Sequence, residues 1–305
     1  HETEILVAGG GVAGVIAALA AARHGRKVAL VEAGAALGGI ATMGGIHSYC
    51  AGLRGGLQDE IDVRTEALAP LFAPADTVQG FHPDARKVAL EMLLQEAGVD
   101  VRYGALLVGA ISTQVEGIVH TGADMTPLRR IQEAVTADAA GSAAWSAKVF
   151  IDATGDGDLA AWAGARCTFG RESDGLPHAY SLSSGRIADG KMNIINFDAG
   201  YTDPTDPWDM TRARREALKL YRRDRYDEAG RPTYMAPLLG LRSSRQVVCD
   251  TMLTLADQVG CARFPDAIAE TVGFHDNHGY DYEFESDQSA FYVWVLGYWL
   301  RHLAY

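Results

Sequence analysis

The sequence predicts an α/β fold, with a central parallel sheet, a β meander and a second domain of mixed α+β type. Three observations lead to this class. Residues 4–34 alternate between strand, glycine turn, helix and strand, which is the pattern of a βαβ unit. Residues 148–165 hold a second apolar strand that runs into a glycine turn. The βα rhythm then fades while Tyr, Trp, Pro and Asp become more frequent, so we expect one domain over residues 1–164 and another over residues 165–305.

The first strand and the first helix lie within one uncharged run, Ile5–Ala22. This run approaches the length of about 20 apolar residues that a membrane-spanning helix needs. The three consecutive glycines at Gly9–Gly11 would each destabilise a continuous helix by about 1 kcal/mol relative to alanine. We therefore predict a strand over EILVA, an alanine-rich helix that ends at Gly25, and a second strand over KVALVEA.

The turn between this strand and helix reads Gly9-x-Gly11-x-x-Gly14. The first glycine permits a tight turn, the second lets a pyrophosphate approach the backbone, and the third lets the helix lie close to the sheet. The helix N-terminus offers free N–H groups to the phosphates. Glu32, at the end of the second strand, can accept hydrogen bonds from ribose hydroxyls and disfavours a 2′-phosphate. This combination predicts a dinucleotide site, and a glycine turn without a ligand is the alternative.

Composition narrows the function classes further. The 305 residues carry a net charge of −12, and the isoelectric point is about 5.2. Such a chain repels phosphate backbones and anionic lipid, so we predict no nucleic-acid partner and no membrane partner. The four cysteines form no C-x-x-C pair, which indicates free thiols in a reducing compartment. We expect a cytoplasmic protein.

The remaining elements follow from periodicity and from the positions of Gly and Pro. We predict helices over 57–71, 83–97 and 208–226, strands over 99–103, 106–115, 117–121, 131–138 and 192–197, and a hairpin loop at DAAGSAAWSA. The third helix is rich in arginine and could form an anion-binding face. We favour a solvated helix whose arginines pair with nearby acids.

Two further glycine loops bear on the identity of the cofactor. LGGIATMGGI follows the acidic strand directly, where an NAD dehydrogenase would continue with an ordinary helix and strand. ATGDGD stands at the carboxyl end of a strand, where open α/β sheets place their ligands. More backbone therefore runs along the cofactor than NAD requires, which favours FAD, and an NAD-only dehydrogenase is the weakest interpretation.

At this point the chain resembles the FAD-dependent oxidoreductase family of the glutathione-reductase-like flavoprotein fold. The similar segments are VAGGGVAGVIAALAAARHGRKVALVEAGAALGGIAT, HPDARKVALEMLLQEAGVDVRYG, FIDATGDGDLAAWAGA, PLLGLRSSRQVVCDTMLT and RFPDAIA. The resemblance implies a Rossmann-like FAD-binding domain that a substrate domain covers. It also implies that FAD lies along Gly9, Gly11, Val12, Ala13, Gly14, Glu32, Ala33, Gly38, Gly39, Ala41, Thr42, Leu107, Ala153, Thr154, Gly155 and Asp156.

Within that set, the first glycine turn would lie under the pyrophosphate and Glu32 would hold the adenosine ribose. The 39–42 segment would run beside the phosphates and the ribityl chain, and Leu107 would contact adenine through its backbone. The family normally closes its flavin site with a C-terminal strand–helix segment, and this chain ends at FYVWVLGYWLRHLAY instead. We therefore expect that a second chain or a C-terminal fragment completes the site, and that the protein forms a homo- or hetero-oligomer.

Two candidate catalytic residues, His47 and Cys50, follow the expected flavin loop in GGIHSYCAGLRGG. A histidine can act as a base because its ordinary pKa is about 6.5, and either residue could carry a covalent flavin bond. Simple packing beneath the cofactor is the alternative. Tyr49, between them, could stack nearby or belong to the core.

Three more candidates come from the second half of the chain. Arg242 and Arg245 could clamp a substrate carboxylate or the flavin edge. An internal salt bridge to Asp250 or Asp257 is the alternative. His278 is a candidate acid–base group in FHDNHGYDYEFESD, where the histidine spacing has no matching partner motif, so we predict no metal site.

We predict that the chain is an FAD-dependent oxidoreductase that transfers a hydride from a small organic substrate to the flavin and then to an acceptor. Two alternatives stay open. One is a nonredox flavin enzyme, such as a hydratase or isomerase. The other is a flavin-binding subunit that works only in a hetero-oligomer.

Overall fold

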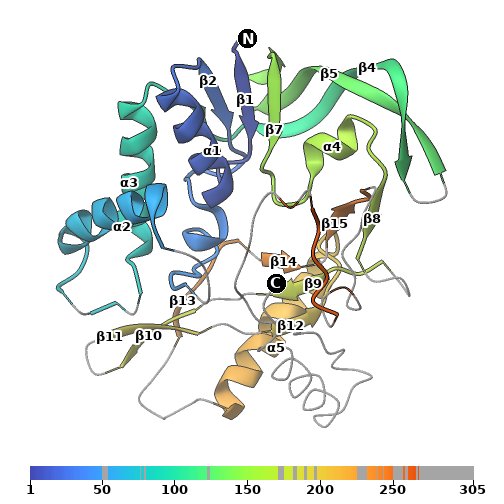
Figure 1. Ribbon diagram of the computed structural model, residues 1–305. Coiled ribbons are helices and arrows are strands. Elements are labelled where there is room, and N and C mark those ends of the chain that lie inside the picture. Colours follow the sequence, from blue (N-terminus) through green and yellow to red (C-terminus); the bar gives the residue numbers. More distant parts are fainter. Residues whose placement is uncertain are drawn as a thin grey trace.

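A computed structural model describes most of the first 250 residues and a few short stretches beyond them (Figure 1). The described residues are 1–49, 54–75, 77–78, 80–121, 124–170, 175–180, 184–188, 191–195, 198–224, 232–238, 240–242, 244–249, 257, 260–265 and 267. All structural statements below concern these residues.

The centre of the fold is a four-stranded parallel sheet of order β3-β2-β1-β7. Its strands are β1 (Ile5–Ala8), β2 (Val28–Val31), β3 (Asp100–Arg102) and β7 (Val149–Asp152). The two middle strands are buried on both faces, which explains why they are apolar at every position. The predicted βαβ unit and the second apolar strand are confirmed as members of one sheet.

Helices cover one face of this sheet (Figure 1). α1 (Val12–Arg23) and α3 (Pro83–Glu96) lie on this face, and α2 (Gly56–Leu68), which continues into the 3-10 helix η2 (Ala69–Leu71), packs on α3. Their inner sides pack against alternate residues of β1 and β2 in one apolar core that includes Val7, Leu30, Leu19 and Leu93. Gly25 follows the end of α1 with φ +74°, as expected of a helix-ending glycine.

An antiparallel meander covers the other face of the sheet. It consists of β4 (Leu106–Thr121), β5 (Asp124–Asp138) and β6 (Gly141–Ser146). We predicted two strands where β4 is a single strand with an irregular register between Gln114 and Ile118. The predicted hairpin at DAAGSAAWSA is present, because a turn at residues 139–140 joins β5 to β6. The predicted loop is too long, since most of it forms β6 and Trp145 is buried with its indole N–H donating to Thr136 Oγ1 at 2.9 Å.

The second half of the chain is of mixed α+β type, as predicted. After α4 (Asp158–Trp162) come β8 (Cys167–Phe169), β9 (His178–Tyr180), β10 (Ser184–Ala188), β11 (Lys191–Ile195), β12 (Asp198–Tyr201), α5 (Pro207–Asp224), β13 (Pro232–Met235), β14 (Gly240–Arg242) and β15 (Arg245–Val247). They form three small antiparallel sheets, β11-β10-β13, β12-β9-β14 and β15-β8. The chain thus has an α/β fold with a Rossmann-like parallel sheet.

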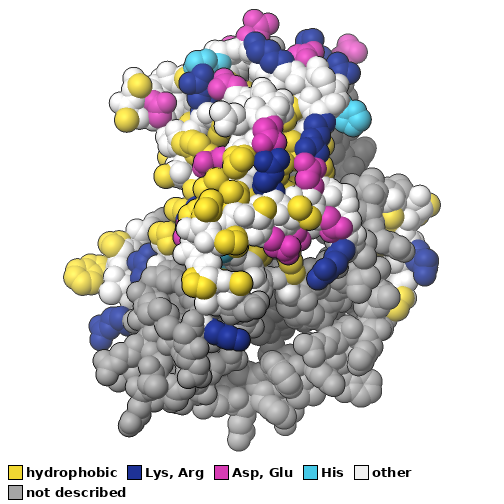
Figure 2. All heavy atoms as spheres, turned by 90° about the vertical axis from the view of Figure 1, so that its left-hand side faces the viewer, with side chains coloured by type: hydrophobic (Ala, Val, Ile, Leu, Met, Phe, Trp, Pro, Cys, Tyr) yellow, Lys and Arg dark blue, Asp and Glu magenta, His cyan; other side chains and the backbone are white. Residues whose placement is uncertain are grey.

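Charged side chains of both signs lie next to each other on the outer side of α2 and α3 (Figure 2). Three ion pairs account for much of this pattern: Arg23–Glu60, Arg64–Glu96 and Lys87–Asp84. On the basic helix α5, Arg212 Nε donates to Asp209 at 2.5 Å. No helix in the described part of the chain is both long enough and apolar enough to cross a bilayer.

Candidate functional site

Two glycine turns leave the same edge of the parallel sheet. β1 and β7 are neighbours, so the turn after β1 and the turn after β7 start side by side. Ala153 N–H donates to the carbonyl oxygen of Ala8 at 2.8 Å and continues the ladder to the edge. Gly9 has φ +99°, and a Cβ there would lie 2.2 Å from the carbonyl oxygen of Ala153. The first turn therefore needs a glycine because the second turn packs directly against it.

The other two glycines of the first turn differ in what surrounds them. A Cβ on Gly14 would lie 1.9 Å from the carbonyl oxygen of Gly9, so this glycine lets α1 pack on the turn. A Cβ on Gly11 would meet no atom within 4 Å, and its φ of −63° suits any residue. Protein packing therefore does not explain a glycine at position 11. Space for a ligand does explain it.

The N-terminus of α1 faces this edge of the sheet with its N–H groups uncapped by any side chain. Gly11 is the N-cap residue, and Val12 and Ala13 begin the helix. No acidic residue stands in the first turn to neutralise the positive end of the helix dipole. Such a helix start attracts an anionic group.

Glu32 lies directly beside the first turn. Its Oε2 accepts the N–H of Gly10 and its Oε1 accepts the N–H of Gly34, both at 2.6 Å. The sequence predicts that Glu32 binds a ribose of the ligand. In the structure its carboxylate also accepts hydrogen bonds from two backbone N–H groups. Ala33, the next residue, is exposed. Ala105 N–H donates to the main-chain oxygen of Glu32 at 3.0 Å, which brings the start of β4 to the same place.

The second glycine loop also reaches the first turn. Gly38 N–H donates to the carbonyl oxygen of Gly10 at 2.8 Å, and Gly38 forms an isolated parallel bridge with Gly11. A Cβ on Gly39 would approach Gly11 Cα to 3.2 Å. Gly39 and Ala41 bound the short helix η1 (Gly39–Ala41), and Thr42 Oγ1 after it donates to the Leu37 carbonyl at 2.6 Å. The structure thus brings these predicted residues together.

The turn after β7 is held by side chains. Asp152 Oδ1 accepts from the Thr154 N–H at 3.1 Å and from its hydroxyl at 2.8 Å, and Asp152 Oδ2 accepts the Ala160 N–H at 2.9 Å. Thr154 Oγ1 in turn accepts the N–H of Asp158 at 2.9 Å. Gly155 has φ +88°, and a Cβ there would meet no atom within 4 Å. Like Gly11, it leaves open space at the carboxyl edge of the sheet.

Residues from the second half of the chain support this turn. Ser244 Oγ donates to Asp156 Oδ1, and Arg245 Nη1 donates to Asp158 Oδ1 and, at 3.1 Å, to the main-chain oxygen of Asp156. Arg245 therefore does pair within the protein, but with Asp158. On the strand that pairs with β15, burial raises the pKa of the Cys167 thiol, and nearby Arg245 partly opposes this.

Leu107, the expected adenine contact, lies in β4 opposite Thr136 of the meander. Its side chain is 8% exposed and belongs to the core beneath the sheet. Its side chain therefore does not take the predicted role, which concerns its backbone.

His47 is fully buried after the second glycine loop. Its carbonyl oxygen accepts the N–H of Phe81 at 2.9 Å, and the two rings meet edge to face at 6.3 Å between centroids. Next to them Arg86 donates to Tyr49 and to Asp62. Burial raises the pKa of Tyr49, an effect that the adjacent Arg86 partly offsets.

Comparison with known proteins gives the family of the chain. The sequence matches the family described as FAD dependent oxidoreductase over residues 4–230. The chain belongs to this family. It is an FAD-dependent oxidoreductase, and FAD is its cofactor. Among curated proteins there is no significant match.

The oxidoreductase is also similar to solved structures. With the THI4 protein of Thermovibrio ammonificans it shares 19% identity over 56% of this chain and 67% of that one, with a TM-score of 0.38. With a geranylgeranyl bacteriochlorophyll reductase-like protein of Thermoplasma acidophilum it shares 15% identity over 80% of this chain and 66% of that one, with a TM-score of 0.49. With p-nitrophenol 4-monooxygenase PnpA of Pseudomonas putida DLL-E4 it shares 14% identity over 79% of this chain and 69% of that one, with a TM-score of 0.46. The chain covers only 35–54% of the length of five further structures.

Three predicted catalytic residues of the oxidoreductase cannot be placed at this edge. Cys50 and His278 lie outside the described residues. Arg242 is described through its backbone, which pairs with His178 in the β14–β9 ladder. Within the described part of the chain, no group of three or more His, Cys, Asp or Glu residues is arranged to hold a metal.

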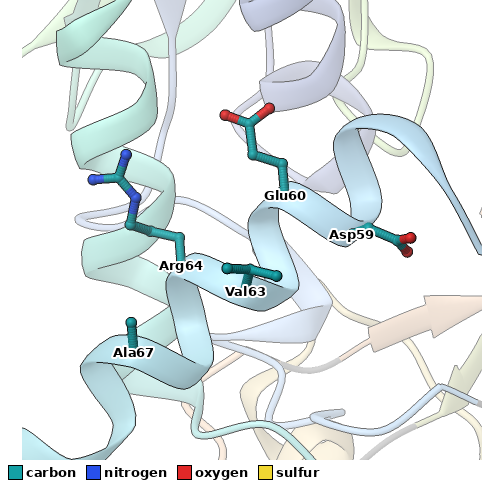
Figure 3. Close-up of a pocket in the computed structure, with 5 residues that line it drawn as sticks. All are labelled: Asp59, Glu60, Val63, Arg64 and Ala67. Carbon is teal, nitrogen blue, oxygen red and sulfur yellow. The ribbon is translucent and has the colours of Figure 1, made fainter.

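A separate hollow lies on α2 (Figure 3). It is lined by Asp59, Glu60, Val63, Arg64 and Ala67, all from one helix. Two of these side chains are already engaged, because Glu60 pairs with Arg23 and Arg64 pairs with Glu96. The hollow shares no residue with the glycine turns and is not part of the candidate site.

The sequence gave no direct signal for five polar residues that hold either the second glycine turn or the segment around Tyr49. They are Asp62, Arg86, Asp152, Asp158 and Ser244. Arg86 gave one usable signal, because it falls on the same face of α3 as the buried Leu90 and Leu93. A charged residue on the apolar face of a helix is expected to be buried, and a buried charge needs an oppositely charged or hydrogen-bonding partner.

Proposed function

We propose that the two glycine turns and the loop at residues 38–42 form the FAD site of this oxidoreductase. The observation that carries the proposal is the open space at Gly11 and Gly155, on neighbouring turns at the carboxyl edge of one sheet. Protein packing does not require a glycine at position 11, and its φ of −63° suits any residue, whereas a diphosphate along this edge would require one. At Gly155 the φ of +88° already favours glycine, so there only the open space supports a ligand.

The parts of the cofactor are assigned from the chemistry of each group. The uncapped N–H groups at Val12 and Ala13 bind the diphosphate. Glu32 accepts ribose hydroxyls with the lone pairs that Gly10 and Gly34 leave free. The backbone at Leu107 contacts adenine, and the 39–42 segment continues along the ribityl chain. Residues 1–164 thus bind FAD, and residues 165–305 cover the substrate.

We propose that the enzyme oxidises a small organic substrate. FAD supplies the redox chemistry, since it takes up a hydride and later yields two electrons to an acceptor. The protein's own contribution is to bind the cofactor, to exclude water and to orient the substrate. His47 is fully buried beside the loop assigned to the flavin, so it is the candidate for holding or moving a proton there.

Anaerobic reduction tests this proposal. The purified protein is loaded with FAD and mixed with candidate alcohols, amines, acids and sugars, and the flavin absorbance is followed. Bleaching by one class identifies the substrate class and supports the oxidative reaction. Turnover of a compound without bleaching would instead indicate a nonredox flavin enzyme. Folded protein that takes up no FAD would contradict the proposed site.

A further inference from the structure

Arg86 is a buried cation in the first turn of α3. Its side chain is only 2% exposed. α3 begins at Pro83, and the N–H of Arg86 donates to the carbonyl oxygen of His82 at 3.0 Å, so the backbone of this turn is fixed. A buried charge is costly unless it is paired and hydrogen-bonded. A leucine or methionine would fill the same core position without that cost.

The guanidinium of Arg86 contacts three separate segments of the chain. Nη2 pairs with Asp62 of α2, and Nη1 donates to the hydroxyl of Tyr49. The guanidinium carbon also lies 3.8 Å from the ring centroid of Phe81, in a cation–π contact. Tyr49 OH donates to Asp62 Oδ1 at 3.0 Å and closes the cluster. One side chain therefore holds a helix and two loop segments together.

The cluster leads directly to His47. The Phe81 N–H donates to the carbonyl oxygen of His47 at 2.9 Å, and the Phe81 ring meets the imidazole edge to face. The fit of this segment is tight, because a Cβ on Gly80 would lie 2.0 Å from the same carbonyl oxygen. Arg86 is thus connected to His47 on two sides, through Phe81 and through Tyr49.

We infer that Arg86 is a positioning residue that sets the place of His47 and of the 46–49 segment relative to the bound flavin. The inference rests on the proposed function, in which the loop before His47 runs beside FAD. Arginine suits this role because its planar fork donates in two directions while its face covers an aromatic ring. Lysine would keep the charge but not the fork. Among the described residues, nothing accepts a hydrogen bond from Arg86 Nε, so the contacts made by Nη1, Nη2 and the guanidinium face carry the role.

The test compares FAD binding and flavin spectra of four variants with the wild type. Arg86→Met removes the fork and keeps the stem, and Arg86→Lys keeps the charge. Tyr49→Phe removes only the hydroxyl, and Arg64→Met is the matched control. Arg64 also joins α2 to α3, through Glu96, but none of its described contacts reaches the 46–49 segment. FAD itself is the probe, and far-UV circular dichroism monitors folding.

We expect Arg86→Met to weaken FAD binding by about tenfold, because a site that is held loosely loses its geometry. The visible absorption and circular dichroism of the bound flavin should also shift. Arg86→Lys and Tyr49→Phe should lie between this variant and the wild type, and Arg64→Met should match the wild type. A purely structural role would lower the melting temperature and leave the spectrum of the bound flavin unchanged.

Two results would overturn the inference. One is a folded Arg86→Met protein whose FAD affinity and flavin spectrum equal those of the wild type. The other is an equal change in Arg86→Met and Arg64→Met, which would assign the effect to the packing of α2 on α3. If Arg86→Met does not fold, Tyr49→Phe decides the question by the same two measurements. Wild-type protein that binds no FAD would contradict the proposed function instead.

Discussion

Arg245 forms an ion pair with Asp158 across 87 residues of sequence, and so joins β15 to the first residue of α4. The adjacent Ser244 donates its hydroxyl to Asp156 in the same turn. The side chain of Ser244 is buried, and the ion pair is about one-third exposed. The segment GLRSSRQ thus supports the second glycine turn from outside the proposed FAD-binding domain. These two contacts explain why a serine and an arginine stand next to each other at positions 244 and 245.

Replacing Arg245 should therefore affect a site that it does not line. Arg245→Met leaves Asp158 without its partner, and we expect the apoprotein to lose about 1 kcal/mol of unfolding free energy. FAD affinity should fall as well, because the turn around Gly155 loses its support. Chemical denaturation and FAD titration measure the two effects. Lys148→Met is the control, since it removes an exposed ion pair with Glu4 at the opposite end of β7, and its FAD affinity should equal that of the wild type.

Gly11 and Gly14 allow binding and folding to be separated. Gly11→Val places its side chain in open space at a backbone conformation that valine adopts readily. We expect the apoprotein to lose less than about 1 kcal/mol, while FAD is no longer retained because the valine occupies the place of the diphosphate. Flavin absorbance after desalting measures retention, and thermal unfolding measures stability.

Gly14→Ala should behave in the opposite way. Its Cβ would overlap the carbonyl oxygen of Gly9, so α1 must move away from the turn, at a cost of about 1–3 kcal/mol. A lowered melting temperature of the apoprotein is the expected result. Wild-type flavin content in Gly11→Val would count strongly against the proposed site.

Glu32 holds two backbone N–H groups and, in the proposed site, also binds a ribose, so its replacement should affect both stability and FAD binding. Glu32→Ala removes the acceptor for Gly10 N–H and Gly34 N–H, so the apoprotein should lose stability. FAD binding should weaken by roughly 1–3 kcal/mol, the usual cost of losing hydrogen bonds to a charged group. Glu4→Ala is the matched control, because Glu4 also accepts a backbone N–H, that of Lys27, but at the opposite edge of the sheet. Equal FAD affinity in Glu32→Ala and Glu4→Ala would contradict the assignment.

Local sequence signals were sufficient for the βαβ unit at the start of the chain. The glycine spacing and the acid at position 32 indicated the βαβ unit, because each residue acts on near neighbours. The error at β6 has a physical cause. Its small residues resemble a loop, and only the burial of Trp145 against Thr136 of the neighbouring strand makes the segment a strand. Short strands such as β8 and β15 were missed because long-range pairing defines them.

The supports of the site could not be predicted for the same reason. Ser244 meets Asp156 from 88 residues away, and Arg86 meets Tyr49 from 37 residues away. No periodicity or spacing encodes such contacts. The sequence could therefore indicate which glycine turns and loops come together at the edge of the sheet. It could not indicate which side chains hold their backbone in place.

We expect His82 to make the start of α3, and with it Arg86, sensitive to pH. Its Nδ1 accepts the N–H groups of Asp84 at 3.2 Å and Ala85 at 3.5 Å, which only an imidazole with a free Nδ1 lone pair can do. Burial lowers the pKa of His82 from its ordinary 6.5, so the folded state favours the neutral form. The stability from this cap is fully present above pH 6.5 and is lost as the pH falls from there through the lower folded pKa.

His82→Asn replaces the ring with a cap that does not titrate. We expect the melting temperature of the wild type to fall more steeply than that of the variant between about pH 7.5 and about pH 5. Parallel profiles would show that the imidazole does not act as the cap of α3.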